Sequence, residues 1–353
     1  MMGGPVSVVP ATAKVGDIGV YLDAIGTVTP VYTASMTAQV TGVITDVHYN
    51  EGQFVQKGAS LIDLDARPYE AQLAQAQGAL ARDQAVLAQA EMDLDRYKQA
   101  WAKNAIPRQQ LEDQEKLVLQ SQGTVKNDEG QVKYDQVQVA YCHITSPISG
   151  RVGLRLVDPG NLVTANATTS LVVVTQSQPI TVIFTLAEDN LSQVLDQMRH
   201  GNTLSVEAWD RDEQKQLAVG KLITLDNQID TTTGTVKLRA SFDNRNNILF
   251  PNQFVNTRLL VTTLKNQVLI PSSAIQHNGD TAFVYLIQDN NAVMRTVKTG
   301  VSNKGETVVQ GIQAGDVVVD SSFEKLQNGS PLVISKTTIP SSSQASESGE
   351  SAP

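Results

Sequence analysis

The sequence of 353 residues has one cysteine, Cys142, and therefore forms no internal disulfide. No run of 18 apolar residues occurs, which excludes a membrane-spanning helix within the sequence as written. The formal net charge of -9, without a basic run or interleaved aromatics, excludes a nucleic-acid partner. The start, MMGGPVSVVP, lacks the basic and apolar regions of a signal peptide, which fits both a chain without its native leader and a cytosolic protein.

Motifs of catalysis are also missing: no Gly-rich phosphate loop, GxSxG elbow, CxxC pair or HExxH helix occurs. Cys142 and His143 are adjacent, and neighbours in a strand point to opposite faces. His48, His200 and His277 stand singly, whereas a metal site needs convergent ligands. We therefore predict no catalytic residue, no cofactor and no metal site.

Residues 66–140 are rich in Ala, Gln, Leu, Glu and Lys and are predicted to be helical. Apolar residues seven apart indicate a coiled-coil seam. Residues 103–107 interrupt this pattern, and proline, here Pro107, is tolerated only in the first turn of a helix. The chain therefore turns back, and two arms of about 35 residues make a rod about 50 Å long. The narrow stripes disfavour the alternative, a core helix pair of a bundle. The seam residues are Leu73, Leu80, Leu87, Leu94, Leu111, Val118, Val125 and Val132, and the first arm's companion stripe is Tyr69, Ala76, Ala90 and Tyr97, interrupted by Asp83.

Acidic residues occur in local pairs such as Asp63 with Asp65. These pairs are interpreted as helix caps and solvated charges rather than as acid–base dyads. Asp65 stands directly before the helical stretch, and an aspartate there accepts hydrogen bonds from free backbone N–H groups. The sequence therefore predicts Asp65 as the N-cap.

The segments at 38–65 and 146–176 form an internal repeat on either side of the rod. Superposition of the two copies places Gly42 on Gly150 and Gly52 on Gly160. Each copy reads as a strand, a turn and a strand, with these glycines as turn residues that supply positive φ. Because neither copy has enough apolar surface to fold alone, we expect the two to pack with pseudo-twofold symmetry around the inserted rod.

The remaining segments are mostly strand-like. Even strand spacing between 179 and 263, with one short helix containing Leu191 and Val194, predicts a closed barrel. A further β-rich unit spans 268–334 and is expected to be completed by the N-terminal strands, and the polar tail at 337–353 is predicted to be disordered. The predicted fold is mainly β with a long α-helical coiled-coil hairpin, and elongated.

This order of parts resembles the periplasmic adaptor, or membrane fusion, proteins of tripartite RND multidrug efflux pumps, of the Mdt/Acr/Mex type. The half-motifs look like the halves of a lipoyl domain. The stretches that carry the resemblance are EAWDR at 207–211, LDNQIDTTTGT at 225–235, LFPNQFV at 249–255 and VLIPSSAI at 268–275.

The resemblance implies four domains. They are a membrane-proximal β domain at 1–14 and 264–336, a β-barrel domain at 15–35 and 177–263, a lipoyl-like domain at 36–65 and 141–176, and the α-helical hairpin at 66–140. It also implies a periplasmic protein attached to the inner membrane by an anchor absent from this sequence. The implied partners are an inner-membrane RND transporter, an outer-membrane TolC-like channel and further copies of the chain, six per pump.

In that family the hairpin tip carries Arg-x3-Leu-x6-Ser, which grips the outer-membrane channel. Arg96 matches the first position, while Ala100 and Pro107 replace the other two. Trp101 could supply the missing apolar bulk, and Ile106 is included as a docking residue. Arg96 as a solvated helix charge and Trp101 as a further seam residue remain alternatives.

Two other functions stay open from the sequence. One is an adaptor that serves an ABC exporter or a type I secretion system, because the rod does not discriminate between transporters. The other is a lipoyl or biotinyl carrier subunit, which needs an acceptor lysine between the half-motifs. That junction, residues 63–67, contains no lysine, and Lys57 lies earlier in an expected turn.

Overall fold

A computed structural model describes residues 6–279, 281–321 and 326–335, so the predicted tail at 337–353 lies outside the described residues. The described chain divides into two compact units. One contains residues 28–182 and 241–253. The other contains the described residues up to Thr27, residues 183–240 and the described residues from Phe254 onward.

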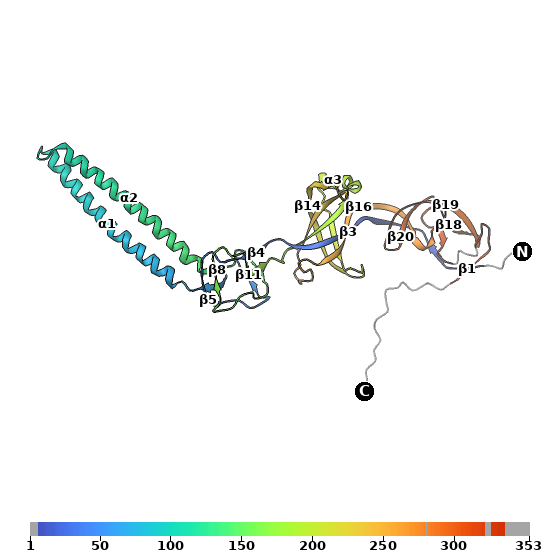
Figure 1. The fold of residues 1–353 in the computed structure, drawn as a ribbon. Coiled ribbons are helices and arrows are strands. Elements are labelled where there is room, and N and C mark those ends of the chain that lie inside the picture. The colour runs from blue at the N-terminus through green and yellow to red at the C-terminus, as the bar shows by residue number, and fades with distance from the viewer. Residues whose placement is uncertain (1–5, 280, 322–325, 336–353) are drawn as a thin grey trace, which may run out of the picture. The chain divides into compact units, whose positions relative to one another are not determined.

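The helical hairpin consists of α1 (Arg67–Ala102) and α2 (Arg108–Tyr141), which run side by side (Figure 1). Helix α1 begins one residue later than predicted, with Ala66 at the N-cap position. Asp65 precedes the cap and accepts a hydrogen bond from the Arg67 backbone N–H at 3.2 Å. Pro68 lies in the first turn, where its missing N–H costs no helical hydrogen bond.

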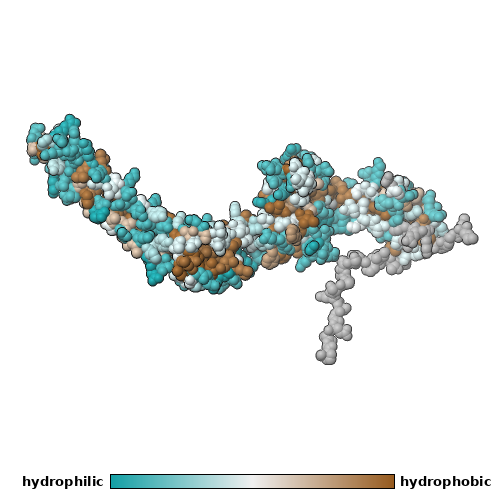
Figure 2. Space-filling model, viewed as in Figure 1, coloured by the Kyte–Doolittle hydropathy of each residue, from teal (hydrophilic) through white to brown (hydrophobic). Residues whose placement is uncertain are grey.

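The contact between the two helices is narrow. Its buried apolar residues are Ala76, Ala90, Val118 and Val125, whereas Trp101, the last step of the predicted stripe, is 46% exposed. Two helices leave each seam side chain open to solvent on one side, which accounts for the limited burial. Figure 2 shows mostly hydrophilic side chains along the hairpin. The half-buried seam residues are Leu73, Leu80, Leu87, Leu94, Leu111 and Val132.

A domain of two four-stranded β-sheets, called the sandwich domain below, is formed by the segments on both sides of the hairpin in the sequence. The strand orders are β10-β5-β7-β8 and β4-β11-β9-β6. The strands are β4 (Thr33–Met36), β5 (Gly42–Val47), β6 (Phe54–Val55), β7 (Ser60–Leu64), β8 (His143–Thr145), β9 (Gly150–Val152), β10 (Leu162–Val163) and β11 (Val172–Thr175).

The repeat produces the expected pseudo-twofold symmetry. Strand β10 pairs with β5 through Leu162 and Val43, and β6 pairs with β9 through Phe54 and Arg151. These two pairings become equivalent when one copy is superimposed on the other. Each copy therefore lends a short strand to the sheet of the other, and neither sheet is complete within one copy.

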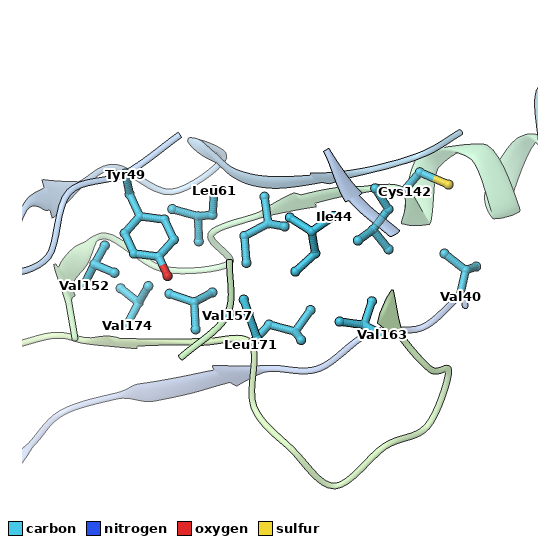
Figure 3. Packing of buried hydrophobic residues seen from close by; sticks show 14 of the residues in the cluster. Val40, Ile44, Tyr49, Leu61, Cys142, Val152, Val157, Val163, Leu171 and Val174 are labelled. Atoms are coloured by element: carbon cyan, nitrogen blue, oxygen red, sulfur yellow. The ribbon is translucent and has the colours of Figure 1, made fainter. Parts of the chain in front are cut away.

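The core of this domain lies between the two sheets (Figure 3). Ile44, Leu61, Val152 and Val174 come from both copies and are buried. Each buried aliphatic side chain contributes about 1.5–3 kcal/mol relative to an exposed one. Cys142, which ends α2, also lies in this core and joins the hairpin to it.

Two of the four predicted turn glycines lie elsewhere. Gly52 and Gly160 have φ of 71° and 91° and occupy turns. Gly42 and Gly150, however, are the first residues of strands β5 and β9. A Cβ on Gly150 would lie 2.6 Å from the Thr175 carbonyl oxygen, so close strand packing, not a turn, requires this glycine.

The predicted closed barrel is confirmed. Its sheet has the order β13-β14-β15-β12-β3-β16, and β13 also pairs with β16, which closes it. The helix α3 (Leu191–Arg199) follows β12. The strands are β3 (Lys14–Pro30), β12 (Ile180–Ala187), β13 (Ser205–Trp209), β14 (Gln216–Asp230), β15 (Thr235–Phe242) and β16 (Phe254–Pro271).

The last β-rich unit continues from β16, which pairs with β20 beyond the barrel. The N-terminal strands complete it, because β2 pairs with β21 and β1 pairs in parallel with β22. Val284, Leu286, Val297 and Val318 form part of its core. Its strands are β1 (Val6–Val8), β2 (Pro10–Thr12), β17 (Gln276–Asn278), β18 (Thr281–Gln288), β19 (Asn291–Asn303), β20 (Glu306–Gln310), β21 (Val317–Val319) and β22 (Leu332–Ile334).

Candidate functional site: the tip and the root of the helical hairpin

The tip is a tight turn between the two helices. The Lys103 N–H donates to the Ala100 carbonyl at 3.1 Å, and the Asn104 N–H donates to the Trp101 carbonyl at 2.7 Å. Asn104 has a φ of 56°, a left-handed conformation that asparagine tolerates well. Pro107 is extended and occupies the N-cap position of α2. The turn is therefore held by its own backbone.

The predicted docking residues surround this turn. Arg96 lies less than two turns before the end of α1, with its side chain 73% exposed, and donates to Asp93 Oδ1 at 3.0 Å. Ala100 and Ile106 are half-buried, and Pro107 is exposed. Trp101 offers the largest apolar surface of the tip. Ala100, Trp101, Ile106 and Pro107 thus lie in or directly beside this turn, while Arg96, a forked cationic donor, lies further back on α1.

The root of the hairpin is anchored in the sandwich domain. The Tyr69 hydroxyl donates to the Thr41 carbonyl at 2.8 Å, which ties the first turn of α1 to the segment before β5. Cys142 is fully buried, and burial, with the nearby Asp65 and Glu70, raises the pKa of its thiol. Cys142 ends a helix rather than lying in a strand, and its core position separates it from the exposed His143.

The root also carries a polar cluster that the sequence did not indicate. His48 Nε2 lies 2.6 Å from Asp63 Oδ2, and His143 Nδ1 lies 2.9 Å from Asp63 Oδ1. The interpretation of Asp63 as a cap or a free solvated charge, and of His48 as an isolated histidine, is therefore wrong. The antiparallel pairing of β5, β7 and β8 brings the three side chains together, with Asp63 directly opposite His143.

Burial alone raises the pKa of Asp63, but the hydrogen bonds from His143 and His48 outweigh it and hold the pKa below its ordinary value. The carboxylate is thus kept ionised between two imidazoles, each of which points one nitrogen at it. This arrangement fastens β8, directly after α2, to β7, directly before α1. It locks the two chain ends from which the hairpin projects.

Family models match the chain in three consecutive segments. The family described as "RND MFP, barrel-sandwich hybrid domain" matches residues 32–175, and "RND MFPs, beta-barrel domain" matches residues 179–263. A third, "YknX, C-terminal permuted SH3-like domain", matches residues 267–334.

Curated relatives match over nearly the whole length. Multidrug resistance protein MdtA of Cronobacter turicensis is 42% identical, over 100% of this chain and 86% of the relative. The MdtA of Klebsiella pneumoniae subsp. pneumoniae is 44% identical, over 92% of this chain and 79% of the relative. The chain belongs to the RND membrane fusion proteins.

Solved structures share the fold of this membrane fusion protein. MacA from Actinobacillus actinomycetemcomitans aligns with a TM-score of 0.57 at 22% identity, over 88% of this chain and 99% of the other. A MacA-MexA chimeric protein with the Pseudomonas aeruginosa MexA α-hairpin domain aligns with a TM-score of 0.56 at 25% identity, over 87% and 99%. The membrane fusion protein is a periplasmic adaptor of an RND multidrug efflux pump, as the sequence motifs implied.

The adaptor's hairpin also has an apolar groove on its flank, with a volume of about 510 Å³. Val86 and Leu117, which line it, are each about half exposed. Neither belongs to a predicted heptad stripe, so the periodicity that identified the seam did not predict them.

None of the described helices is both long and apolar enough to cross a membrane.

Proposed function

We propose that this adaptor bridges an inner-membrane RND transporter and an outer-membrane TolC-like channel, and that the hairpin tip grips the channel. The observation that carries the proposal is a two-helix rod about 50 Å long, anchored at its root and exposed at its tip. Its curated relatives are named multidrug resistance proteins, which supports drugs as the exported compounds.

The tip chemistry fits a protein surface. The Arg96 guanidinium reaches only Asp93 on its own helix, so most of its donors remain available for backbone carbonyls or carboxylates of a partner. Trp101 provides the aromatic contact that is enriched where interfaces bind most tightly. Ala100 and Pro107 keep the tip small, and the half-buried Ile106 adds a further apolar side chain to it.

The other domains supply the remaining contacts of the proposal. With the domain boundaries given above, the barrel and the last β-rich unit engage the transporter, and several copies, six per pump, surround the conduit. Exposed apolar side chains on the sandwich domain, among them Phe54, Leu154 and Leu162, offer a surface for contact between copies. In this proposal an anchor beyond the described residues attaches the adaptor to the inner membrane.

The proposed role needs no catalysis and no prosthetic group. A lipoyl or biotinyl carrier presents a lysine at the junction of its half-motifs, but here β7 is followed by Asp65 and Ala66 and then by α1. Lys57 lies in a turn, where its backbone N–H donates to Ser149 Oγ at 2.9 Å. The position at which a carrier domain would present its modified lysine is occupied here by the start of the helical hairpin.

Site-directed crosslinking tests the docking role. Because Cys142 is the only cysteine and is buried, cysteines introduced at 96, 101 and 106 can be crosslinked singly in cells that contain the candidate channel. We expect adducts with the channel from all three positions. Lys133, exposed on α2 far from the tip, is the control position and should give none. Equal crosslinking from 133 and from the tip would contradict the proposal.

Deletion of the rod tests the bridging role. Replacing residues 66–140 by a short Gly-Ser linker should leave the sandwich sheets intact, because β7 and β8 already pair directly. We expect the shortened protein to fold and to co-purify with the transporter while drug resistance is lost. Resistance that survives the deletion would overturn the bridging role.

A further inference from the structure

The chain leaves the sandwich domain for the barrel through a short linker, residues 176–179, between β11 and β12. A loop at 243–253 joins the barrel strands β15 and β16, and it belongs to the same compact unit as the sandwich and the linker. The two segments are far apart in the sequence, yet side-chain hydrogen bonds join them. Two amides, Asn244 of the loop and Gln178 of the linker, make these bonds, and we call the pair the amide clamp.

Asn244 is buried and uses its whole amide group. Its Nδ2 donates to the Ser177 carbonyl of the linker at 3.0 Å and to the Leu249 carbonyl of its own loop at 2.9 Å. Its Oδ1 accepts a hydrogen bond from the Leu249 backbone N–H at 3.0 Å. A buried amide costs free energy unless its polar atoms are paired, and here both the nitrogen and the oxygen are paired. Asn244 therefore braces the loop and holds the linker against it.

Gln178 makes the reciprocal contact from the linker. Its Nε2 lies 3.3 Å from the Asn244 carbonyl oxygen, 3.2 Å from the Arg245 carbonyl oxygen and 3.1 Å from Asn247 Oδ1. The side chain is exposed, but its nitrogen is within hydrogen-bond distance of these three acceptors in the loop. Each segment is thus held by a side chain of the other.

Backbone hydrogen bonds tie both segments to the second crossing between sandwich and barrel, where β3 ends and β4 begins. The Gln176 N–H donates to the Tyr32 carbonyl at 2.9 Å, which fastens the linker. The Asn252 N–H donates to the Val28 carbonyl at 2.8 Å, which fastens the loop. The linker, the loop and the second crossing therefore form one hydrogen-bonded joint.

Apolar packing between the loop and the sandwich is incomplete. A pocket of about 180 Å³ lies between them, and its walls include Val152 of β9 and Leu249 and Phe250 of the loop. The side chain of Phe250 is 60% exposed. A protein core normally leaves no such space, so the loop and the sandwich do not share a continuous core here. The connection therefore depends on the hydrogen bonds of the amide clamp.

We propose that the amide clamp locks the linker and the loop into one rigid joint, and that this joint transmits movements of the barrel to the sandwich and its hairpin. Asn244 and Gln178 act as positioning residues, because they bind no partner and fix two segments of the chain against each other. The consequence for efflux rests on the proposed bridging function, since transmission matters only when the barrel and the hairpin tip each hold a partner.

Hydrogen–deuterium exchange of the full chain tests the lock. Asn244 has a φ of 51°, so Asn244→Gly keeps this backbone conformation and removes only the side chain. The Leu249 amide loses its acceptor directly. The proposal requires the Gln176 amide of the linker to exchange about tenfold faster as well, because the linker is no longer held against the loop. Asn266→Gly makes the same change at an exposed residue with a φ of 55°, and this matched control should leave linker exchange unchanged.

Gln178→Ala removes the other half of the clamp. Because this side chain is exposed, the variant should fold normally and should raise linker exchange about threefold. In both clamp variants the peptides that cover β7 and β13 should keep the wild-type rate. The proposal would be wrong if only the Leu249 amide responded, if β7 and β13 lost as much protection as the linker, or if the linker in Gln178→Ala exchanged as in the wild type.

Measurements in cells distinguish the joint from the bridging function. In Asn244→Gly we expect crosslinking from position 96 to the channel and co-purification with the transporter to persist, while drug resistance is lost. Absence of tip crosslinking in the otherwise wild-type protein would count against the bridging function. Full resistance in Asn244→Gly, with the linker shown to be released, would instead refute transmission through the joint.

Discussion

The sandwich domain and the hairpin belong to one compact unit, yet they are stabilised in different ways. The sandwich buries side chains from two segments that lie on opposite sides of the hairpin in the sequence, and it completes each sheet with a strand of the other repeat copy. The hairpin has few buried apolar residues and relies on hydrogen bonds within each helix. Long-range packing therefore holds the root, and local structure holds the rod.

This difference explains why polar residues are tolerated in one region and scarce in the other. A carboxylate in the hairpin seam reaches solvent or a neighbour on its own helix, as Asp135 does through Gln131 at 3.1 Å. A carboxylate between the two sheets has no such outlet, and no carboxylate is buried among the described residues of the sandwich domain. The hairpin can therefore be long without burying a large hydrophobic core.

The largest difference in stability between the sandwich domain and the hairpin should appear when one leucine in each is replaced by alanine. Leu61 is fully buried between the sheets, so Leu61→Ala should cost about 2–5 kcal/mol of unfolding free energy. Leu80 is half-buried in the seam, and its side chain is already partly exposed to solvent. Leu80→Ala should therefore cost only about 1–2 kcal/mol of unfolding free energy.

The thiol of Cys142 provides the measurement, since it is the only cysteine and lies in the sandwich core. The labelling rate with a disulfide reagent should rise about a hundredfold in Leu61→Ala, which corresponds to about 2.7 kcal/mol. It should change only slightly in Leu80→Ala. Equal acceleration by both variants would mean that rod and root unfold as one cooperative unit.

The two repeat copies allow a sharper comparison. A Cβ at Gly150 would lie 2.6 Å from the Thr175 carbonyl oxygen, whereas one at Gly42 would meet Leu64 Cβ at 3.5 Å, an ordinary contact. Gly150→Ala should therefore destabilise the domain by about 1–3 kcal/mol, and Gly42→Ala by less than about 1 kcal/mol. Thermal unfolding of both variants checks this, and equal melting temperatures would contradict it.

The cluster of Asp63, His48 and His143 at the root of the hairpin should contribute less to the free energy of unfolding. Asp63→Asn should cost about 1 kcal/mol near neutral pH, because the amide replaces two charge-assisted hydrogen bonds at a partly exposed site. Since the pKa of Asp63 is lowered, this contribution is present above its ordinary value and is lost as the pH falls through the lowered one.

Urea unfolding at pH 6 and at pH 2.5 measures the difference between the wild type and Asp63→Asn. The difference should shrink at the lower pH. Asp46→Asn, an exposed carboxylate opposite Asp63 in the register of β5 and β7, serves as the control and should have no measurable effect. A cost for Asp63→Asn that persists unchanged at pH 2.5 would show that charge is not its source.

The sequence was informative wherever a pattern repeats. Heptad spacing predicted both helices, and the correspondence of Gly52 with Gly160 predicted two copies of one strand-turn-strand unit packed together. Periodicity did not predict residues that depend on which strands pair. Asp63 meets His143 only because β7 and β8 are neighbours, and both helices of the hairpin lie between these strands in the sequence, beyond the reach of any local pattern.

Gly42 and Gly150 show a second limit. Both were assigned to turns because glycine permits positive φ, but both begin strands, and at Gly150 the glycine permits a close approach between strands instead. The sequence does not distinguish these two uses of glycine. Likewise the seven-residue spacing placed Asp83 in the seam as an interruption. It gave no sign of which residue on the other arm would face Asp83, because the register between the arms depends on how the turn at 103–107 is built.

Substitution of Arg96 should change stability least and test the contrast between rod and root from the functional side. The side chain is exposed and pairs only with Asp93 on its own helix, a contact worth about 0.3–0.5 kcal/mol. Arg96→Ala should therefore leave the thermal unfolding temperature unchanged within experimental error, yet it should greatly reduce crosslinking to the channel and drug resistance.

Arg96→Lys keeps the charge without the planar fork and should restore part of the function. Asp93→Asn removes the ion pair while leaving the guanidinium in place, so full function in this variant separates the partner contact from the helix contact. If Arg96→Ala kept full resistance and crosslinking, Arg96 would be one more solvated charge on the rod, and docking would depend on the exposed indole of Trp101.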